Sequence, residues 1–165
     1  TEITYEGYGP GGVAILVKCL TDNKNRSISE VRHAFSKHGG NMGTSGSVAY
    51  IFKPKGVFTL PKGELDEDTV TMAALEGEAD DVADGGEVWE VTCALESYAT
   101  CRTALQELGV EGLKGETTMI PDNGVPVTGG DLPKLMKLLE RLDDLDDTQD
   151  VYSNAEIDDA DLEAL

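Results

Sequence analysis

Residues 6–20, EGYGPGGVAILVKCL, decide how the chain begins. Three of the glycines have the G-x-G-x-x-G spacing that holds the pyrophosphate of a dinucleotide such as NAD: Gly7, Gly9 and Gly12. That motif needs a helix to begin at the last glycine, because the helix N-terminus faces the phosphates. Here the last glycine leads into VAILVKCL, an apolar run that is typical of a buried strand. The stretch therefore predicts two strands, about 2–8 and 13–20, joined by a tight glycine-rich turn.

The next elements complete a first unit. Ser27 and Glu30 have the S-x-x-E spacing of a capping box, which predicts a helix over 28–38. One face of this helix is apolar and carries Ile28, Val31, Ala34 and Phe35. A strand over 47–53 is expected after it.

Residues 56–121 follow a different pattern. The segments GVFTL, DDVADGG, EVWEVTCAL and GETTMIP are typical of strands. Helices are predicted in LDEDTVTMAALEGE, between the first two strands, and in SYATCRTALQELG, between the last two. The order is βαββαβ, which is the ferredoxin-like arrangement.

An amphipathic helix, LPKLMKLLERLDDL, and a last strand, TQDVYSNA, remain near the C-terminus. A completed βαββαβ sheet has no place for them, so we expect them to return to the first unit and pair with it. The predicted fold class is α+β, with a ferredoxin-like βαββαβ domain, 56–121, inserted into a second mixed α+β domain made of 1–55 and 122–157. Residues 158–165 are expected to form an acidic tail.

The charge is unevenly distributed along the chain. The 165 residues have a net charge of −19, but residues 1–60 hold seven Lys and Arg against four Asp and Glu, a net charge of +3. The other 105 residues have a net charge of −22. This asymmetry suggests that the basic part faces an anionic partner. The alternative is that the acidic excess serves only solubility.

The sequence offers no sign of an enzyme, a cofactor or a metal site. Its three cysteines have neither C-x-x-C spacing nor a neighbouring His and are expected to be buried free thiols in a reducing compartment: Cys19, Cys93 and Cys101. DDVADGG resembles the start of a calcium loop, but Val82 and Val91 stand where ligands are required. No Ser or Cys lies in a nucleophile elbow. A hydrolase or metal-dependent enzyme remains only a remote alternative.

The candidate nucleic-acid-binding residues lie on and just before the helix of the first unit: Lys24, Arg26, Arg32, His33 and Lys37. His33 and Lys37 point away from the apolar face and have no evident packing role. The glycine-rich loop 39–46 lies beside them in the sequence. The alternative is that these side chains form an ordinary solvated surface.

Several blocks of the sequence closely resemble the YebC-type family: GYGPGG (7–12), LTDN-NR (20–26), EVRHAFSKHGG (30–40), GSVAYIF (46–52), ETTMIP (116–121) and DVYSNAEI (150–157). Members are known as probable transcriptional regulatory proteins in bacteria and, in mitochondria, as a translational activator of cytochrome c oxidase. The resemblance implies a ferredoxin-like domain inserted into a second α/β domain. It also implies regulation of gene expression without catalysis or a cofactor. The loop residues that match the family motifs are Gly7, Tyr8, Gly9, Pro10, Gly11, Gly12, Asn23, Gly39, Gly40, Asn41 and Gly43.

The same resemblance implies a basic N-terminal helical domain, absent from this sequence, that makes most of the nucleic-acid contact. No apolar run approaches the roughly 20 residues of a membrane span, so we expect a soluble protein without a membrane partner. We expect a monomer, in the cytoplasm or alternatively in the mitochondrial matrix.

Two targets stay open. A DNA-binding regulator of transcription would need Arg, Asn or Gln side chains aimed at base edges. A ribosome-associated translation factor that binds rRNA would need only a basic patch near flexible loops. Lys24, Arg26 and the loop 39–46 could provide that patch.

Overall fold

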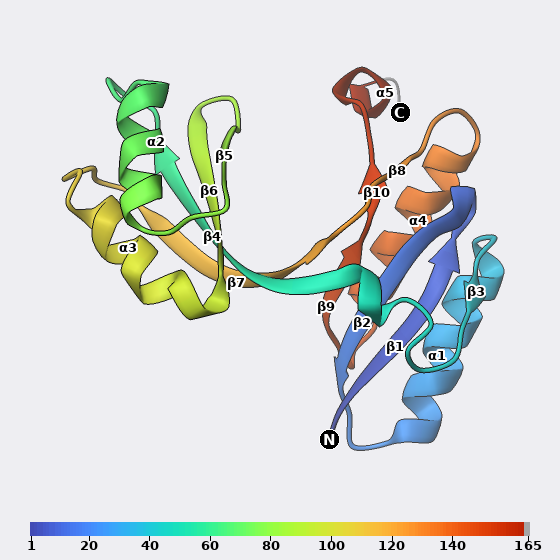
Figure 1. The fold of residues 1–165 in the computed structure, drawn as a ribbon. Coiled ribbons are helices and arrows are strands. Elements are labelled where there is room, and N and C mark those ends of the chain that lie inside the picture. The colour runs from blue at the N-terminus through green and yellow to red at the C-terminus, as the bar shows by residue number, and fades with distance from the viewer. Residues whose placement is uncertain (164–165) are drawn as a thin grey trace. The chain divides into compact units, whose positions relative to one another are not determined.

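The computed structural model describes residues 1–163. The elements group into two compact units, each of which is described by itself (Figure 1). The first unit joins Thr1–Lys53 to the chain from Ile120 onward, and the second is Pro54–Met119. Both units mix helices and antiparallel strands, which confirms the predicted α+β class.

The first unit begins with the predicted hairpin. Strands β1 (Glu2–Gly9) and β2 (Val13–Leu20) pair antiparallel and are joined by the 3-10 turn η1 (Pro10–Gly12). Gly11 and Gly12 have φ angles of 82° and 81° in this turn, and glycine adopts such left-handed angles at no steric cost. The turn leads into a strand, as predicted, and therefore lacks the helix N-terminus that a pyrophosphate site requires.

The C-terminal segment completes the same sheet. Its strand order is β3-β1-β2-β9, with β3 at Asn41–Met42 and β9 at Thr148–Ser153. β9 pairs antiparallel with β2, which confirms that the last predicted strand returns to the first unit. Two short strands, β8 (Val125–Pro126) and β10 (Ala155–Glu156), form a separate parallel pair.

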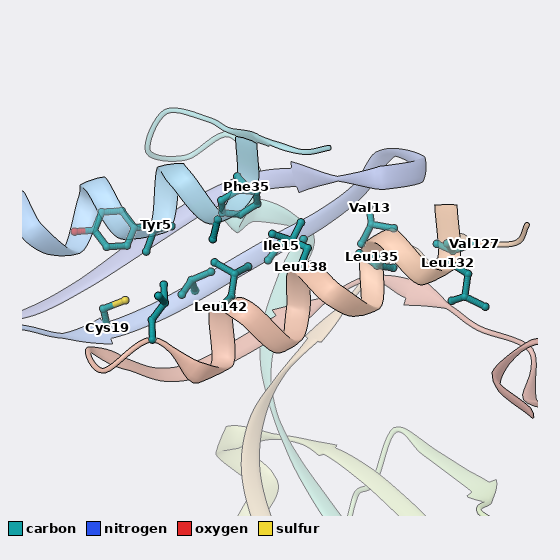
Figure 2. Packing of buried hydrophobic residues seen from close by; sticks show 14 residues of the cluster. Tyr5, Val13, Ile15, Cys19, Phe35, Val127, Leu132, Leu135, Leu138 and Leu142 are labelled. Carbon is teal, nitrogen blue, oxygen red and sulfur yellow. The ribbon is translucent and has the colours of Figure 1, made fainter. Parts of the chain in front are cut away.

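Helices α1 (Lys24–Lys37) and α4 (Asp131–Asp144) cover one face of this sheet (Figure 2). Their apolar stripes meet the inward-facing side chains of β1 and β2. Burial of each large side chain contributes about 1.5–3 kcal/mol to folding. The largest fully buried residues of this core are Phe35, Ile15, Leu135, Leu138, Leu142, Val13, Val17 and Val31.

Helix α1 begins earlier than predicted. Its N-cap is Asn23, whose side chain accepts a hydrogen bond from the backbone N–H of Arg26 at 3.1 Å. The predicted capping box at Ser27 and Glu30 was therefore wrong. Because Asn23 supplies the cap, the helix begins before Ser27, and Ser27 is a buried residue within its first turns.

The predicted strand 47–53 was also wrong. Strand β4 (Phe52–Pro61) begins later, after the 3-10 turn η2 (Ala49–Ile51). The cause is the carboxylate of Glu6, a side chain that is only 4% exposed. It accepts three backbone N–H groups from this segment: Gly46 at 2.6 Å, Val48 at 2.9 Å and Ala49 at 2.6 Å. An N–H that is bonded to Glu6 is not available to a neighbouring strand.

The second unit has the ferredoxin-like order βαββαβ. Its elements are β4, α2 (Glu67–Glu76), β5 (Asp81–Asp84), β6 (Val88–Ala94), α3 (Tyr98–Gln106) and β7 (Lys114–Pro121), with the short 3-10 turn η3 (Leu95–Ser97) before α3. The strand order is β5-β6-β4-β7. Its core joins Phe58, Leu60 and Val91 of the sheet to Val70 and Leu105 of the helices.

A short helix, α5 (Asp159–Glu163), lies within the predicted acidic tail, and residues 164–165 of that tail lie outside the described residues. Among residues 1–163, no helix is both long and apolar enough to cross a membrane.

Candidate nucleic-acid interface

Helix α1 carries all five basic residues that were predicted to bind nucleic acid. With about 100° of rotation per residue, Arg26, His33 and Lys37 fall in one row along the exposed side of the helix. Arg32 lies at least about 100° from that row. Lys24, in the first turn, is also exposed.

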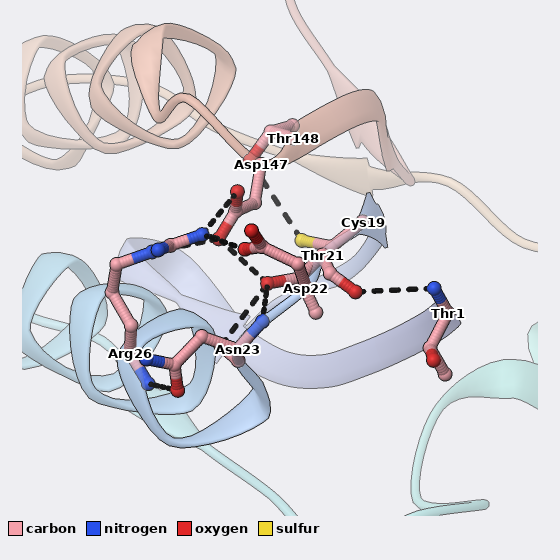
Figure 3. Close-up of polar contacts among 8 residues, drawn as sticks. All are labelled: Thr1, Cys19, Thr21, Asp22, Asn23, Arg26, Asp147 and Thr148. Carbon is pink, nitrogen blue, oxygen red and sulfur yellow. Dashed lines mark hydrogen bonds and ion pairs between the residues drawn. The ribbon is translucent and has the colours of Figure 1, made fainter.

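Arg26 is paired with acidic neighbours of its own chain (Figure 3). Its Nη2 atom lies 2.8 Å from Oδ1 of Asp22 and 3.0 Å from Oδ1 of Asp147. The hydrogen bond and charge of Arg26 hold the pKa of Asp22 below its usual range. Because two carboxylates share its charge, Arg26 offers less to a phosphate than the sequence alone suggested.

The other four predicted residues are available. Lys24, Arg32, His33 and Lys37 are exposed, and none of them forms an ion pair within the part of the chain that the structure describes. Lys37 lies in the last turn of α1, where a cation also interacts favourably with the helix dipole.

The motif LTDN-NR is occupied by structural contacts around the start of α1 (Figure 3). The hydroxyl of Thr21 donates to Oδ2 of Asp147 at 2.9 Å and accepts from the backbone N–H of Asn23 at 3.0 Å. Asn23 in turn caps the helix. These contacts attach the start of α1 to the segment that joins α4 to β9.

The motif glycines lie at points of close packing. A Cβ on Gly7 would lie 2.6 Å from the carbonyl oxygen of Asn41 and 2.8 Å from Cε1 of Phe35. A Cβ on Gly40 would lie 2.5 Å from the carbonyl oxygen of Tyr8. Gly9 is confined by side chains of the core, such as Ile15 at 2.9 Å. These glycines let β1 approach β3 and the two helices.

The two glycine-rich segments lie together at the C-terminal end of α1. β1 and β3 pair Tyr8 with Asn41, and a Cβ on Gly39 would lie 3.7 Å from Cγ of the buried Pro10. The backbone N–H of Gly43 donates to the carbonyl oxygen of Glu6 at 2.7 Å. The structure therefore brings residues 7–12 next to residues 39–43, which follow Lys37 at the end of α1.

The segment that follows Gly43 is fixed by Glu6. Burial raises the pKa of this carboxyl. The hydrogen bonds from Gly46, Val48 and Ala49 together lower the pKa by more than burial raises it, so the net shift is downward. Glu6 is ionised at neutral pH. The segment 43–49 is thus held in a defined conformation beside the sheet.

Sequence analysis missed three basic residues of α4: Lys134, Lys137 and Arg141. All three are exposed, and none forms an ion pair with any of residues 1–163. Their i, i+3, i+7 spacing is visible in the sequence. From the sequence, α4 was predicted only as an amphipathic helix that packs through its apolar face.

The exposed cations of this arrangement are suited to binding anions. Among residues 1–163 there is no group of three or more His, Cys, Asp and Glu that could hold a metal. The thiols of Cys19, Cys93 and Cys101 are buried, and burial raises the pKa of each. A buried thiol with a raised pKa is a poor nucleophile.

Comparisons with known proteins agree with the resemblance of the motifs. The family model described as the second and third domain of TACO1/YebC matches residues 1–155. The probable transcriptional regulatory protein YebC of Shigella boydii is 52% identical over 95% of this chain, and a probable transcriptional regulatory protein of Koribacter versatilis is 48% identical over 99%. The chain spans 63% and 66% of the lengths of these two relatives.

A solved structure shares the fold. A conserved hypothetical protein from Aquifex aeolicus is 42% identical, with a TM-score of 0.81 over 96% of this chain and 66% of that protein. With a family model matched over nearly its whole length, and with relatives about half identical to it, the chain belongs to the TACO1/YebC family and corresponds to its second and third domain.

Proposed function

We propose that this chain is part of a non-enzymatic, DNA-binding regulator of transcription and that it contacts the DNA through the outer face of α1. The observation that carries the proposal is that Lys24, Arg32 and Lys37 of α1 are exposed and form no ion pair within residues 1–163, with His33 beside them on the helix. Cations without internal partners can neutralise phosphates without first giving up an ion pair. The names of the relatives, probable transcriptional regulatory proteins, support the regulatory part of the proposal.

The geometry favours contact with phosphates over reading of bases. Of the two Arg residues of α1, Arg26 is held by Asp22 and Asp147. Arg32 lies at least about 100° from the row that His33 and Lys37 share. Direct readout of a base pair relies on Arg, Asn or Gln in a groove. The proposed contact is therefore largely independent of sequence.

This independence also favours a second candidate, a ribosome-associated translation factor that binds rRNA. Structured RNA is recognised by its shape and its backbone, and the cations of α1 would suit either nucleic acid. The loop 39–46 was expected to be flexible in this role, but Gly43 and Gly46 are held by hydrogen bonds to Glu6, so the cations alone support this candidate.

A salt titration tests the proposal. Binding of the chain to duplex DNA and to a structured rRNA fragment is measured by fluorescence anisotropy, beginning at low ionic strength because the net charge is −19. The variant Arg32→Glu/Lys37→Glu should bind both more weakly, with the slope of log K against log salt smaller by about two.

The matched control is Arg102→Glu/Lys114→Glu, which makes the same charge change at exposed residues of the second unit. It should retain most of the affinity and the slope. Equal losses in both variants would show that only the net charge matters, and the proposal for α1 would be rejected. Stronger binding to DNA than to rRNA supports the transcriptional role, and the reverse supports the second candidate.

A further inference from the structure

We infer that α4 supplies a second row of cations to the same surface, so that one phosphate backbone lies along the seam between α1 and α4. The inference rests on the proposed function and adds the path that the phosphate backbone follows over the surface. Both helices lie on the same face of the sheet and touch each other (Figure 2).

The three cations of α4 lie on a different side of the helix from Glu140 and Asp143. Met136, Leu139, Glu140 and Asp143 line a hollow with Val151 and Ser153 of β9, so this side of α4 faces the sheet edge at β9. The row Lys134, Lys137 and Arg141 lies about 160° around the helix from Met136 and Leu139. β9 is the edge strand on one side of the sheet, whereas α1 packs beside β1 and the opposite edge strand, β3. The cations of α4 are therefore on the side that faces α1.

The row of α1 is turned toward α4. Arg26 reaches Asp147, which follows α4 in the chain, whereas Phe35 packs on Gly7 next to β3. His33 and Lys37 share the row of Arg26, so they lie on the same side of α1. The seam is bordered by Lys37 on one helix and by Lys134, Lys137 and Arg141 on the other.

The balance of charge along the seam is positive. None of these four cations forms an ion pair within residues 1–163. Helical spacing places two carboxylates, Glu30 and Asp144, in the same rows. Two more, Asp22 and Asp147, lie at the end of the α1 row, where both are paired with Arg26. The carboxylates Glu140 and Asp143 of α4 lie on the side that faces β9, so the positive charge of α4 is concentrated at the seam.

The residues of the seam are suited to the phosphate backbone of a nucleic acid and not to its bases. The one aromatic residue of α1, Phe35, is fully buried, and α4 contains no aromatic residue. Apart from the small imidazole of His33, the two helices offer no aromatic side chain for the base stacking that single-strand-binding proteins use. Lys134 and Arg141 are about 10 Å apart along the axis of α4, which corresponds to roughly three nucleotides of one strand.

Charge reversal on α4 tests the inference. The variant Lys134→Glu/Lys137→Glu changes the first half of the helix, where acidic residues are compatible with the helix dipole. We expect weaker binding to DNA and rRNA, with a salt slope smaller by about two. The control Arg102→Glu/Lys114→Glu should bind nearly as well as the unchanged chain. Melting curves verify that all variants are folded.

Lysine acetylation read by mass spectrometry gives an independent measurement. Bound nucleic acid should protect Lys37, Lys134 and Lys137 from acetic anhydride, whereas Lys114 should react as in the free chain. Protection of Lys37 alone, with full affinity of the α4 variant, would overturn the seam and leave the proposed function in place. Absence of binding to both nucleic acids at low salt would overturn the two proposals together.

Discussion

Glu6 and Ala49 are 43 residues apart in the chain, yet Oε1 of Glu6 lies 2.6 Å from the backbone nitrogen of Ala49. The same carboxylate also accepts from Gly46 and Val48. The segment between β3 and β4 is therefore organised by one side chain of β1.

Replacement of Glu6 by Gln should destabilise the first unit. A neutral amide accepts the three N–H groups less strongly, and its own NH₂ group would be directed at backbone donors. We expect a loss of about 1–3 kcal/mol in the free energy of unfolding, measured by urea denaturation. Glu2→Gln, at an exposed position of the same strand, is the control and should change stability little.

The same carboxylate predicts how stability depends on pH. Hydrogen bonding lowers the pKa of Glu6 in the folded state despite its burial, so its contribution is complete above the unfolded value of about 4.3. The contribution is lost as the pH falls through the folded pKa. The melting temperature of the unchanged chain should therefore drop more steeply than that of Glu6→Gln between about pH 4.5 and 2.5. Parallel curves would contradict this role.

The packing of Gly7 predicts a cost for even a single methyl group. In Gly7→Ala the new Cβ would meet the backbone at Asn41 and the ring of Phe35. We expect destabilisation of about 1–3 kcal/mol. Gly130→Ala is the control, because nothing lies within 4 Å of its Cβ and its φ is −68°. Similar losses at the two positions would argue against close packing as the reason for the motif.

Dinucleotides should not bind at the glycine-rich turn. The turn leads into β2, so no helix N-terminus faces a bound pyrophosphate. Addition of NAD should leave the melting temperature unchanged, because a ligand that binds only the folded state must raise it. A dose-dependent rise would restore the pyrophosphate hypothesis for Gly7, Gly9 and Gly12.

The cysteines should be unreactive in the folded chain. Burial, with smaller contributions from Cys93, raises the pKa of Cys101 to about 12, and Cys19 and Cys93 are buried as well. Ellman's reagent at neutral pH should label none of the three until urea unfolds the chain. Rapid labelling of a native thiol would show that its unit opens locally.

Much of the fold could be predicted because its signals are local. The hairpin 2–20 and the βαββαβ order follow from periodicity and turn residues within a few positions of each element. The segment 43–51 could not be predicted in this way, because its conformation depends on Glu6, which lies far away in the sequence. The start of α1 has a local signal in Asn23, but the S-x-x-E spacing at Ser27 competes with it.

The candidate site likewise combines local signals with contacts that only the folded structure shows. The spacing of His33 and Lys37 indicates that they lie outside the apolar face of α1. The pairing of Arg26 with Asp147 joins positions 121 residues apart, so only the folded structure shows that its charge is shared. The relation of the α4 cations to α1 depends on the strand order β3-β1-β2-β9, which no local pattern contains.

The second unit is attached to the first through two neighbouring strands, β4 and β7. At their bases the backbone N–H of Asp122 donates to the carbonyl oxygen of Ile51 at 2.8 Å, so the chain leaves the first unit and re-enters it at adjacent points. Because these two points are adjacent, we expect that a hairpin turn, a tag or a foreign domain with neighbouring termini can replace Pro54–Met119 without a long linker. The first unit would then be produced alone, or with a reporter in place of its insertion, with its own core residues unchanged.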